Sequence, residues 1–274
     1  YLRFATPQLA ETVRRASAEA SSGALKFQLG ILTSRFRANH PLKACRACMI
    51  EDAQVHTTAY WHWSHQLPGV WVCLHHRLWL VASDLKATGV RRFHWILPFQ
   101  AQFPPGDESV PPDQAFALAK MVVGLASREM LSLDPQALTR TYRQALGARG
   151  LLSSPGHRLR HYEAGQRYAA FLQPLPRFEQ LGGLPRSSEA AAGEIARLIG
   201  TARSGIHPLR HLMLSTWLLG SVEEFLSMYA KVNQPSEVSQ AAQASTHSTP
   251  ASNVVDERKH RLAALLQLGL SVSR

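Results

Sequence analysis

The spacing of the cysteines constrains the fold more than any other feature of the sequence. The chain has three cysteines, Cys45, Cys48 and Cys73, and His76 completes the pattern C-x2-C-x24-C-x2-H. A two-residue gap lets one tight turn direct both members of a pair at one ion, and Zn²⁺ takes four tetrahedral thiolate or imidazole ligands. We therefore expect one zinc ion bound by these four residues. Four protein ligands leave no position for a catalytic water, so the ion is expected to be structural.

Two alternatives to this ligand set stay open. Free cysteines are often buried as small hydrophobic residues, so the three can also be unligated. His75 can replace His76, although a one-residue gap closes a knuckle less easily. Three cysteines cannot all pair in disulfides, and their metal-like spacing indicates a reducing compartment, which favours the cytoplasm.

The charge of the chain indicates an acidic partner. Its 274 residues carry a formal net charge of +11, supplied mostly by arginine, with 45% hydrophobic residues to build cores. Arginine binds phosphate through a planar fork of donors, so nucleic acid is the leading partner, and a merely basic protein is the alternative. We expect no membrane partner, because the longest apolar run, residues 212–219, is far shorter than the ~20 residues of a membrane span.

Hydrophobic periodicity predicts a mostly α chain, in which a small zinc-knuckle module with short strands precedes helical domains of helix-turn-helix type. The residues from about 40 to 103 lack helical periodicity and are rich in aromatic and β-branched side chains. Six segments are expected: an N-terminal helical segment (1–39), the zinc-binding module (40–105), two helix-turn-helix-type units (113–183 and 184–232), a disordered linker (233–256) and the start of a truncated helical unit (257–274).

Start and stop signals place the helices. Asp134 before Pro135 is a typical N-cap followed by proline at the first helical position, and Asp113 is expected to cap an earlier helix. The predicted helices are 7–20, 113–131, 135–148, 162–172, 187 or 188 to 199, 207–219 and 221–232. A short basic turn, 151–160, separates two of them and gives the helix-turn-helix order. A second turn, 201–205, gives the same order again.

Three segments carry a resemblance to a known family. Residues 45–52 (CRACMIED) and 60–76 (YWHWSHQLPGVWVCLHH) resemble the TniQ/TnsD family of transposon target-selection proteins, and residues 207–214 (HPLRHLML) resemble an element of its longer, TnsD-type members. The family usually has proline where this chain has Arg46 and Leu74, neither of which is an expected ligand. Relatives are usually longer at both ends, so the chain is expected to be truncated there.

The resemblance implies a role before the chemistry of transposition. Such proteins choose the insertion site, either by binding attachment-site DNA or by bridging to an RNA-guided effector complex of a CRISPR-associated transposon, and they recruit the transposon's AAA+ ATPase regulator. We expect double-stranded DNA and that regulator as partners, the guide-RNA complex as the alternative partner, and a location at the bacterial nucleoid. Because the sequence has no grouped acidic triad, P-loop or nucleophile motif, we expect no enzymatic activity.

Arginines near the two predicted turns are the expected DNA contacts, because they can neutralise phosphates beside a recognition helix. Residues 134–211 hold eleven arginines, no lysine and five acidic residues. The predicted contacts are Arg158, Arg160, His161 and Arg167 in the first unit and Arg203, His207, Arg210 and His211 in the second. For each residue a solvated surface charge is the alternative, and for His207 with His211 a metal pair is a further alternative.

The aromatic residues beside the predicted zinc site have two interpretations. Tyr60, Trp61, Trp63 and Trp71 are expected to form the small core of the module, with stacking on bases or on a partner as the alternative. His62 and His65 are expected to hydrogen-bond within that core. The acidic pair Glu51 and Asp52 is expected to neutralise Arg46 or to contact a partner.

Overall fold

The fold is described from a computed structural model of the chain. It describes residues 2–5, 7–18, 36, 41–86, 96–128, 132–154, 157–175, 179–200 and 206–233. The described residues from Leu2 to Val232 belong to one compact unit. Apart from residue 233, the expected linker 233–256 and the expected terminal unit 257–274 lie outside the described residues.

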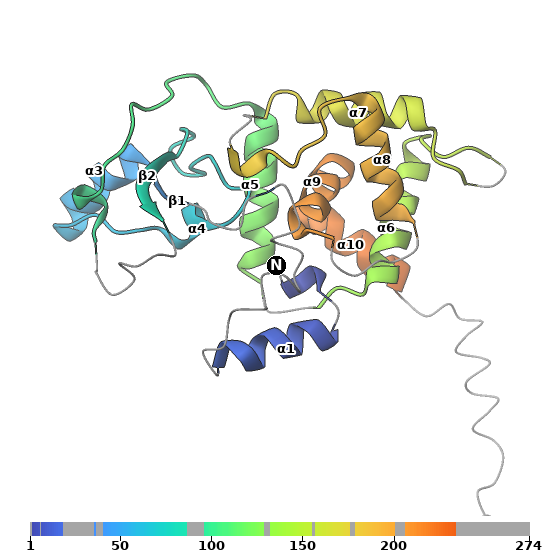
Figure 1. The fold of residues 1–274 in the computed structure, drawn as a ribbon, viewed down its shortest axis with the longest axis horizontal. Coiled ribbons are helices and arrows are strands. Elements are labelled where there is room, and N and C mark those ends of the chain that lie inside the picture. The colour runs from blue at the N-terminus through green and yellow to red at the C-terminus, as the bar shows by residue number, and fades with distance from the viewer. Residues whose placement is uncertain are drawn as a thin grey trace, which may run out of the picture. The chain divides into compact units, whose positions relative to one another are not determined.

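The first part of the chain contains a small two-stranded sheet, as expected. After η1 (Leu2–Phe4) and α1 (Pro7–Ala18), strand β1 (Pro41–Ala44) pairs antiparallel with β2 (Val81–Lys86). Between the strands lie α3 (Arg46–His56) and α4 (Trp63–Gln66), which Figure 1 shows next to the sheet. We call residues 41–86 the zinc-knuckle module.

Helix α3 lies in the stretch 40–103, where the sequence shows no helical periodicity and only short strands were expected. Its buried residues are Cys48, Met49 and Asp52, which follow helical spacing. One of the three is an acid and one is a cysteine, so the buried face does not appear as an apolar stripe in the sequence. A helix whose inward face is chemically mixed is invisible to hydrophobic periodicity.

The rest of the described chain is helical, so the expected mostly α fold with a small module of short strands is confirmed. Where the predicted helices can be compared with the structure, their bounds agree within two residues, except that α5 ends at Ala126, short of the predicted 131. The elements are η2 (Pro98–Gln100), α5 (Asp113–Ala126), α6 (Pro135–Ala148), α7 (His161–Leu172), η3 (Glu179–Leu181), α8 (Ser188–Ile199), α9 (Pro208–Leu219) and α10 (Val222–Asn233).

Two of the helix starts follow from capping chemistry. The Asp134 side chain accepts a hydrogen bond from the Ala137 amide at 2.7 Å, and the Ser187 hydroxyl accepts one from the Ala190 amide at 3.1 Å. Each bond satisfies an amide that has no partner within the helix. The expected cap at Asp113 is wrong by one position, because Pro112 is the N-cap and Asp113 lies in the first turn, where its charge favours the helix dipole.

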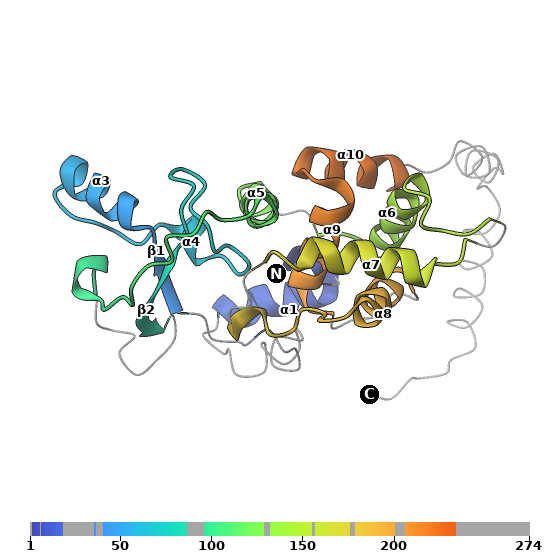
Figure 2. The ribbon, with the colours of Figure 1, turned by 90° about the horizontal axis from the view of Figure 1, so that it is seen from above.

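Helix α5 connects the zinc-knuckle module to the later helices, and both views show it between them (Figure 1, Figure 2). The Arg77 guanidinium of the module lies 4.3 Å from the ring centre of Phe116 on α5. Gly69 of the module faces Leu118 and Val122 of α5 and Leu209 of α9. One hydrophobic core therefore runs from the module's buried cysteines into the helices.

The two predicted helix-turn-helix-type units share this core. Helices α7 and α8, which belong to different predicted units, pack against each other more extensively than any other pair of described elements, and Figure 2 shows them alongside each other. The connection between α6 and α7 is a short hairpin with a β-bridge between Leu152 and Leu159, longer than the three or four residues of a standard helix-turn-helix. Within the described residues, no helix has the length and apolar character needed to cross a membrane.

Candidate metal centre and basic surface

The first cysteine pair lies where β1 passes into α3. Cys45 is the N-cap residue of α3, and its carbonyl accepts the amide of Met49 at 3.0 Å. Cys48 follows in the first turn of the helix. Because a strand end and a helix start meet here, the two sulfurs point to the same side, and both side chains are buried.

The second pair lies on a tight hairpin that is bridged between Val72 and Trp79. The Cys73 amide donates to the Leu78 carbonyl at 2.8 Å, and the Arg77 amide donates to the Cys73 carbonyl at 3.0 Å. Arg77 takes a positive φ of 58° to close the turn. The His76 amide points back at the Cys73 sulfur at 3.4 Å, an arrangement that supports a thiolate.

The hairpin and the helix start bring the four predicted ligands together. The Nδ1 atom of His76 lies 3.2 Å from the Cys48 sulfur and 3.8 Å from the sulfurs of Cys45 and Cys73. The sulfurs of Cys48 and Cys73 are 3.6 Å apart. All four ligand atoms lie within 4.8 Å of one another. This geometry is compatible with a metal site.

The electrostatics of the cluster favour a bound cation. Burial, followed by the charge of Cys73, raises the pKa of the Cys48 thiol to about 12. The hydrogen bond between Cys45 and Cys73 raises the pKa of Cys45 and lowers that of Cys73. Three sulfurs this close cannot all ionise without compensation, and a cation between them supplies it.

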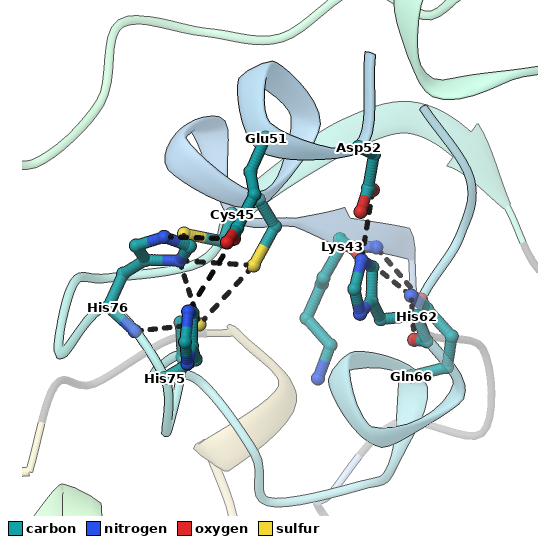
Figure 3. A network of polar contacts seen from close by, with 10 residues as sticks. Lys43, Cys45, Glu51, Asp52, His62, Gln66, His75 and His76 are labelled. Carbon is teal, nitrogen blue, oxygen red and sulfur yellow. Dashed lines mark hydrogen bonds and ion pairs between the residues drawn. The ribbon is translucent and has the colours of Figure 1, made fainter. Parts of the chain in front are cut away.

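A carboxylate lies beside both histidines of the hairpin. The Oε2 atom of Glu51 lies 3.4 Å from Nε2 of His76 and 3.5 Å from Nε2 of His75, as Figure 3 shows. The His75 side chain is 70% exposed. Of the two, His76 belongs to the cluster with the three cysteines and His75 does not, and Glu51 lies where a carboxylate can orient the His76 ring.

The other acidic residue has a structural partner. Asp52 is buried, and its Oδ2 atom lies 3.0 Å from Nε2 of His62 (Figure 3). Neither acid pairs with Arg46 in the described structure, because Arg46 donates instead to the Pro104 carbonyl at 2.8 Å. The expectation that this pair neutralises Arg46 is wrong.

Lys43 and Gln66 join the sheet to the turn that follows α4. The Gln66 side chain accepts from the Lys43 amide at 2.9 Å and donates to the Lys43 carbonyl at 2.8 Å, so it extends the pairing of β1 (Figure 3). In return the Lys43 ammonium donates to the carbonyls of Leu67 and Val70. Burial lowers the pKa of Lys43 to about 7. Sequence reasoning missed both residues, since neither has a spacing that predicts a partner.

The expectation that the four aromatic residues form a core is confirmed only in part. Trp71 is buried, and Trp61 is partly buried and donates to the Ile96 carbonyl at 2.8 Å. Tyr60 and Trp63 are 44% and 57% exposed, so the expectation is wrong for these two. The predicted hydrogen bond of His62 is formed with Asp52.

The predicted DNA contacts of the first unit lie on the surface. Arg158 and Arg160 belong to the hairpin before α7, and His161 and Arg167 belong to α7 itself; all four side chains are exposed. Arg160 lies 3.5 Å from the carboxylate of Glu163. Among the described residues, no carboxylate is within ion-pair distance of Arg158 or Arg167.

Arg143, which sequence reasoning missed, fixes this hairpin from α6. Its Nε donates to the Ile199 carbonyl at 3.0 Å and one terminal nitrogen donates to the His157 carbonyl at 3.3 Å. The Ser153 amide donates to the Arg158 carbonyl at 2.8 Å within the hairpin. The basic hairpin is therefore held against α6, and the same arginine joins it to the end of α8.

Three of the four predicted contacts in the second unit point inward, and the fourth, Arg203, lies outside the described residues. His207 is 2% exposed, and its Nδ1 accepts from the Leu209 amide at 3.2 Å. Arg210 forms an ion pair with buried Glu194. His211 lies 3.2 Å from the Tyr142 hydroxyl. These three side chains stabilise the packing around α9, so they are not carried into the proposed DNA surface.

Comparison with known protein families agrees with this geometry. Residues 118–260, slightly more than half of the chain, match the family model TnsD, described as Tn7-like transposition protein D. Residues 2–80 match the family model TniQ, and they contain all four residues of the cysteine and histidine cluster. No curated protein matches the chain.

Proposed function

Because the chain belongs to the family of Tn7-like transposition protein D and also carries a TniQ region, we propose that it selects the target site of a transposon. In this proposal it binds attachment-site DNA and recruits the transposon's AAA+ ATPase regulator. It acts at the bacterial nucleoid and leaves the cutting and joining of DNA to a separate transposase.

The basic surface of α7 and its hairpin supports DNA binding more than any other single observation. Arg158 lies in the hairpin that leads directly into α7, and His161 and Arg167 lie on α7; all three side chains are exposed. Arg143 donates to the hairpin backbone and so helps to fix its position. Tyr162 is 74% exposed on the same helix, beside Gln166 at 2.9 Å. Arginine and glutamine can both form paired hydrogen bonds to base edges in the major groove.

A salt titration of DNA binding tests this proposal. Each phosphate contact contributes about 0.9 to the slope of log K against log salt concentration. In the full chain, Arg158→Ala with Arg167→Ala is expected to lower that slope by about 2 for duplex DNA. The charge-matched control is Arg14→Ala with Arg15→Ala, because those arginines lie on α1 and pair only with Glu11 among the described residues.

Two results would contradict the proposed DNA surface. An equal change of slope in both double variants would mean that net charge alone attracts the DNA. An unchanged slope in the Arg158 and Arg167 variant would show that α7 and its hairpin do not contact the DNA backbone through these arginines. Sequence selection is tested by comparing attachment-site duplex with scrambled duplex at one fixed salt concentration, because phosphate contacts carry no base sequence information.

For the metal centre we propose one structural Zn²⁺ bound by Cys45, Cys48, Cys73 and His76. With Zn–S bonds of about 2.3 Å and Zn–N bonds of about 2.0 Å, a tetrahedral site has S···S edges of about 3.8 Å and S···N edges of about 3.5 Å. The corresponding separations here are 3.6 Å and 3.2–3.8 Å. Three sulfurs and one nitrogen suit zinc better than a hard oxygen-seeking cation.

An adaptor function is the second candidate. Apolar side chains on the surface of the zinc-knuckle module favour it, since a partner can cover them: Ile50, Val55, Tyr60 and Trp63 are 57%, 68%, 44% and 57% exposed. In this case the module bridges an RNA-guided effector complex to the transposition machinery, and DNA affinity is weak and unspecific. Trp63→Ala would then abolish capture of the effector complex while leaving the salt slope of DNA binding unchanged.

A further inference from the structure

A cavity of about 740 Å³ lies where the loop before α8 meets α8 and α9. Of the described residues predicted to contact DNA, only Arg210 lies in its lining, and that side chain is paired with Glu194. Its lining is polar and includes two neighbouring glycines, Gly182 and Gly183. The residues that line it are Gly182, Gly183, Leu184, Pro185, Arg186, Ser187, Ala190, Glu194, Arg197 and Arg210.

The charges in this lining are unequal. Three arginines, Arg186, Arg197 and Arg210, face a single carboxylate, that of Glu194. Glu194 is 2% exposed, whereas Arg186 is exposed and the Arg197 side chain is 46% exposed. The charges of Arg186 and Arg197 therefore lie at the open side of the cavity, and the Glu194 carboxylate lies at its base together with Arg210.

Glu194 is already engaged by buried groups. Its Oε1 atom accepts from the Tyr168 hydroxyl at 3.2 Å, and its Oε2 atom pairs with Arg210. Arg197 approaches the same Oε2 only to 3.8 Å. Among the residues that the structure describes, Arg186 has no carboxylate within ion-pair distance. The Arg186 guanidinium is thus available to an added anion, and the half-exposed Arg197 guanidinium, whose contact with Glu194 is long, can bind the same anion.

The walls of the cavity are held in place before any ligand binds. The Arg210 guanidinium lies 4.9 Å from the ring centre of Phe36. The backbone of Gly183 packs on the same ring, where an added Cβ would lie 3.0 Å from a ring carbon. Ser187 caps α8 at the edge of the cavity, and the start of a twelve-residue helix adds positive potential there.

We infer that this cavity is a phosphate-binding site in which Arg186 and Arg197 bind the anion and the Arg210–Glu194 pair forms the floor. Guanidinium groups bind phosphate oxygens through paired donors, and a floor that is already neutralised does not repel the ligand. The phosphate can belong to the DNA backbone or to a free nucleotide. The first case rests on the proposed function, and the second does not.

Three variants of the full chain separate the site from general surface charge. Arg186→Ala with Arg197→Ala removes the two anion contacts. Ala190→Phe keeps every charge and places a bulky ring in the cavity from the first turn of α8. Arg14→Ala with Arg15→Ala removes the same charge on α1 and serves as the control. Far-ultraviolet circular dichroism establishes that each variant is folded.

The free-phosphate arm titrates pyrophosphate by calorimetry at fixed ionic strength. If the source is a free nucleotide, the wild-type chain and the control bind, and both cavity variants lose at least tenfold in affinity. In the DNA arm, the Arg186 and Arg197 variant loses about 2 units of salt slope, and Ala190→Phe weakens DNA binding although no charge has changed. Either pattern supports the site.

Two outcomes overturn the inference. One is that pyrophosphate and DNA binding are unchanged in both cavity variants. The other is that the Arg14 and Arg15 control loses as much phosphate or DNA binding as the Arg186 and Arg197 variant, while Ala190→Phe leaves binding unchanged. A wild-type chain that binds pyrophosphate but no DNA would refute the proposed function and leave the phosphate site standing.

Discussion

Gly69 lies directly against Leu209, and this contact joins two segments that are 140 positions apart in the sequence. A Cβ added at Gly69 would lie 2.7 Å from Cδ1 of Leu209, and the φ of Gly69 is +87°. Gly69 belongs to the turn fixed by Lys43, and Leu209 is 1% exposed in the first turn of α9. The zinc-knuckle module and the helices therefore meet at a point that requires glycine for two independent reasons.

Gly69→Ala is expected to destabilise the chain by about 2–5 kcal/mol. Left-handed backbone costs a residue with a Cβ about 1–2 kcal/mol, and overpacking a core costs about 1–3 kcal/mol. Gly150→Ala is the matched control, since Gly150 has a φ of +69° and nothing within 4 Å of an added Cβ, so it carries only the backbone strain. Urea unfolding measures both. Equal losses in the two variants would show that Leu209 yields to the new methyl group.

Cys73→Ser is expected to release the metal. Metal-linked folding free energy of several kcal/mol, a rough magnitude for a structural zinc site, is then lost from the hairpin that carries Cys73 and His76. Mass spectrometry of metals in the purified wild-type chain should find about one zinc per chain. His75→Ala is the control and should keep the metal, because His75 is exposed and outside the cluster. A wild-type chain without zinc would refute the metal centre.

Gly165→Ala is expected to disrupt the packing of α7 on α8, with a loss of about 3 kcal/mol or more. An added Cβ would lie 2.2 Å from the Ser188 carbonyl oxygen and 3.0 Å from the Ala192 Cβ. A backbone atom cannot yield as a flexible side chain can, so the helices have to separate. Thermal unfolding followed by circular dichroism measures the loss.

Gly193→Ala is the matched control for that prediction. Gly193 also lies inside a helix, α8, but an added Cβ there meets nothing within 4 Å. Alanine in a helix interior is more stable than glycine by about 0.5–1 kcal/mol, so this variant should gain stability. If both variants gained stability, the close approach of α7 and α8 at Gly165 would be refuted.

The helices that could be predicted are those whose signals are local. Asp134 with Pro135 and Ser187 with its amide partner determine where α6 and α8 begin, and neither depends on the rest of the fold. The spacing within each pair of predicted metal ligands is also local, because its members are only three residues apart, whereas the approach of the two pairs depends on the fold.

Long-range contacts could not be predicted. Arg210 was predicted to contact DNA in the second helical unit, because the sequence gives no sign that this arginine is buried. In the structure it pairs with Glu194 on another helix. Helix α3 was missed because Asp52 interrupts its inward face. In both cases a polar side chain is buried against a partner that only the tertiary structure brings near, and hydrophobic patterning contains no signal for it.

His211 is expected to make stability depend on acid pH. Burial, followed by neighbouring His207, lowers its pKa to about 4, against an ordinary value of 6.5. Between these values the unfolded chain binds more protons than the folded chain, so this contribution is complete above about pH 6.5 and is lost as the pH falls towards 4. The loss is on the order of 3 kcal/mol.

The difference in unfolding free energy between wild type and His211→Asn isolates this effect from other titrating groups. In the wild type, His211 contacts the Tyr142 hydroxyl at 3.2 Å and stacks on Phe4 at 5.1 Å between ring centres. Asparagine can keep a polar contact there but does not titrate. Urea unfolding at steps between pH 4 and 7 should show a difference that shrinks as the pH falls, because only the wild type is penalised by protonation. A difference that is constant over this range would show that His211 can accept a proton without leaving its place beside Tyr142.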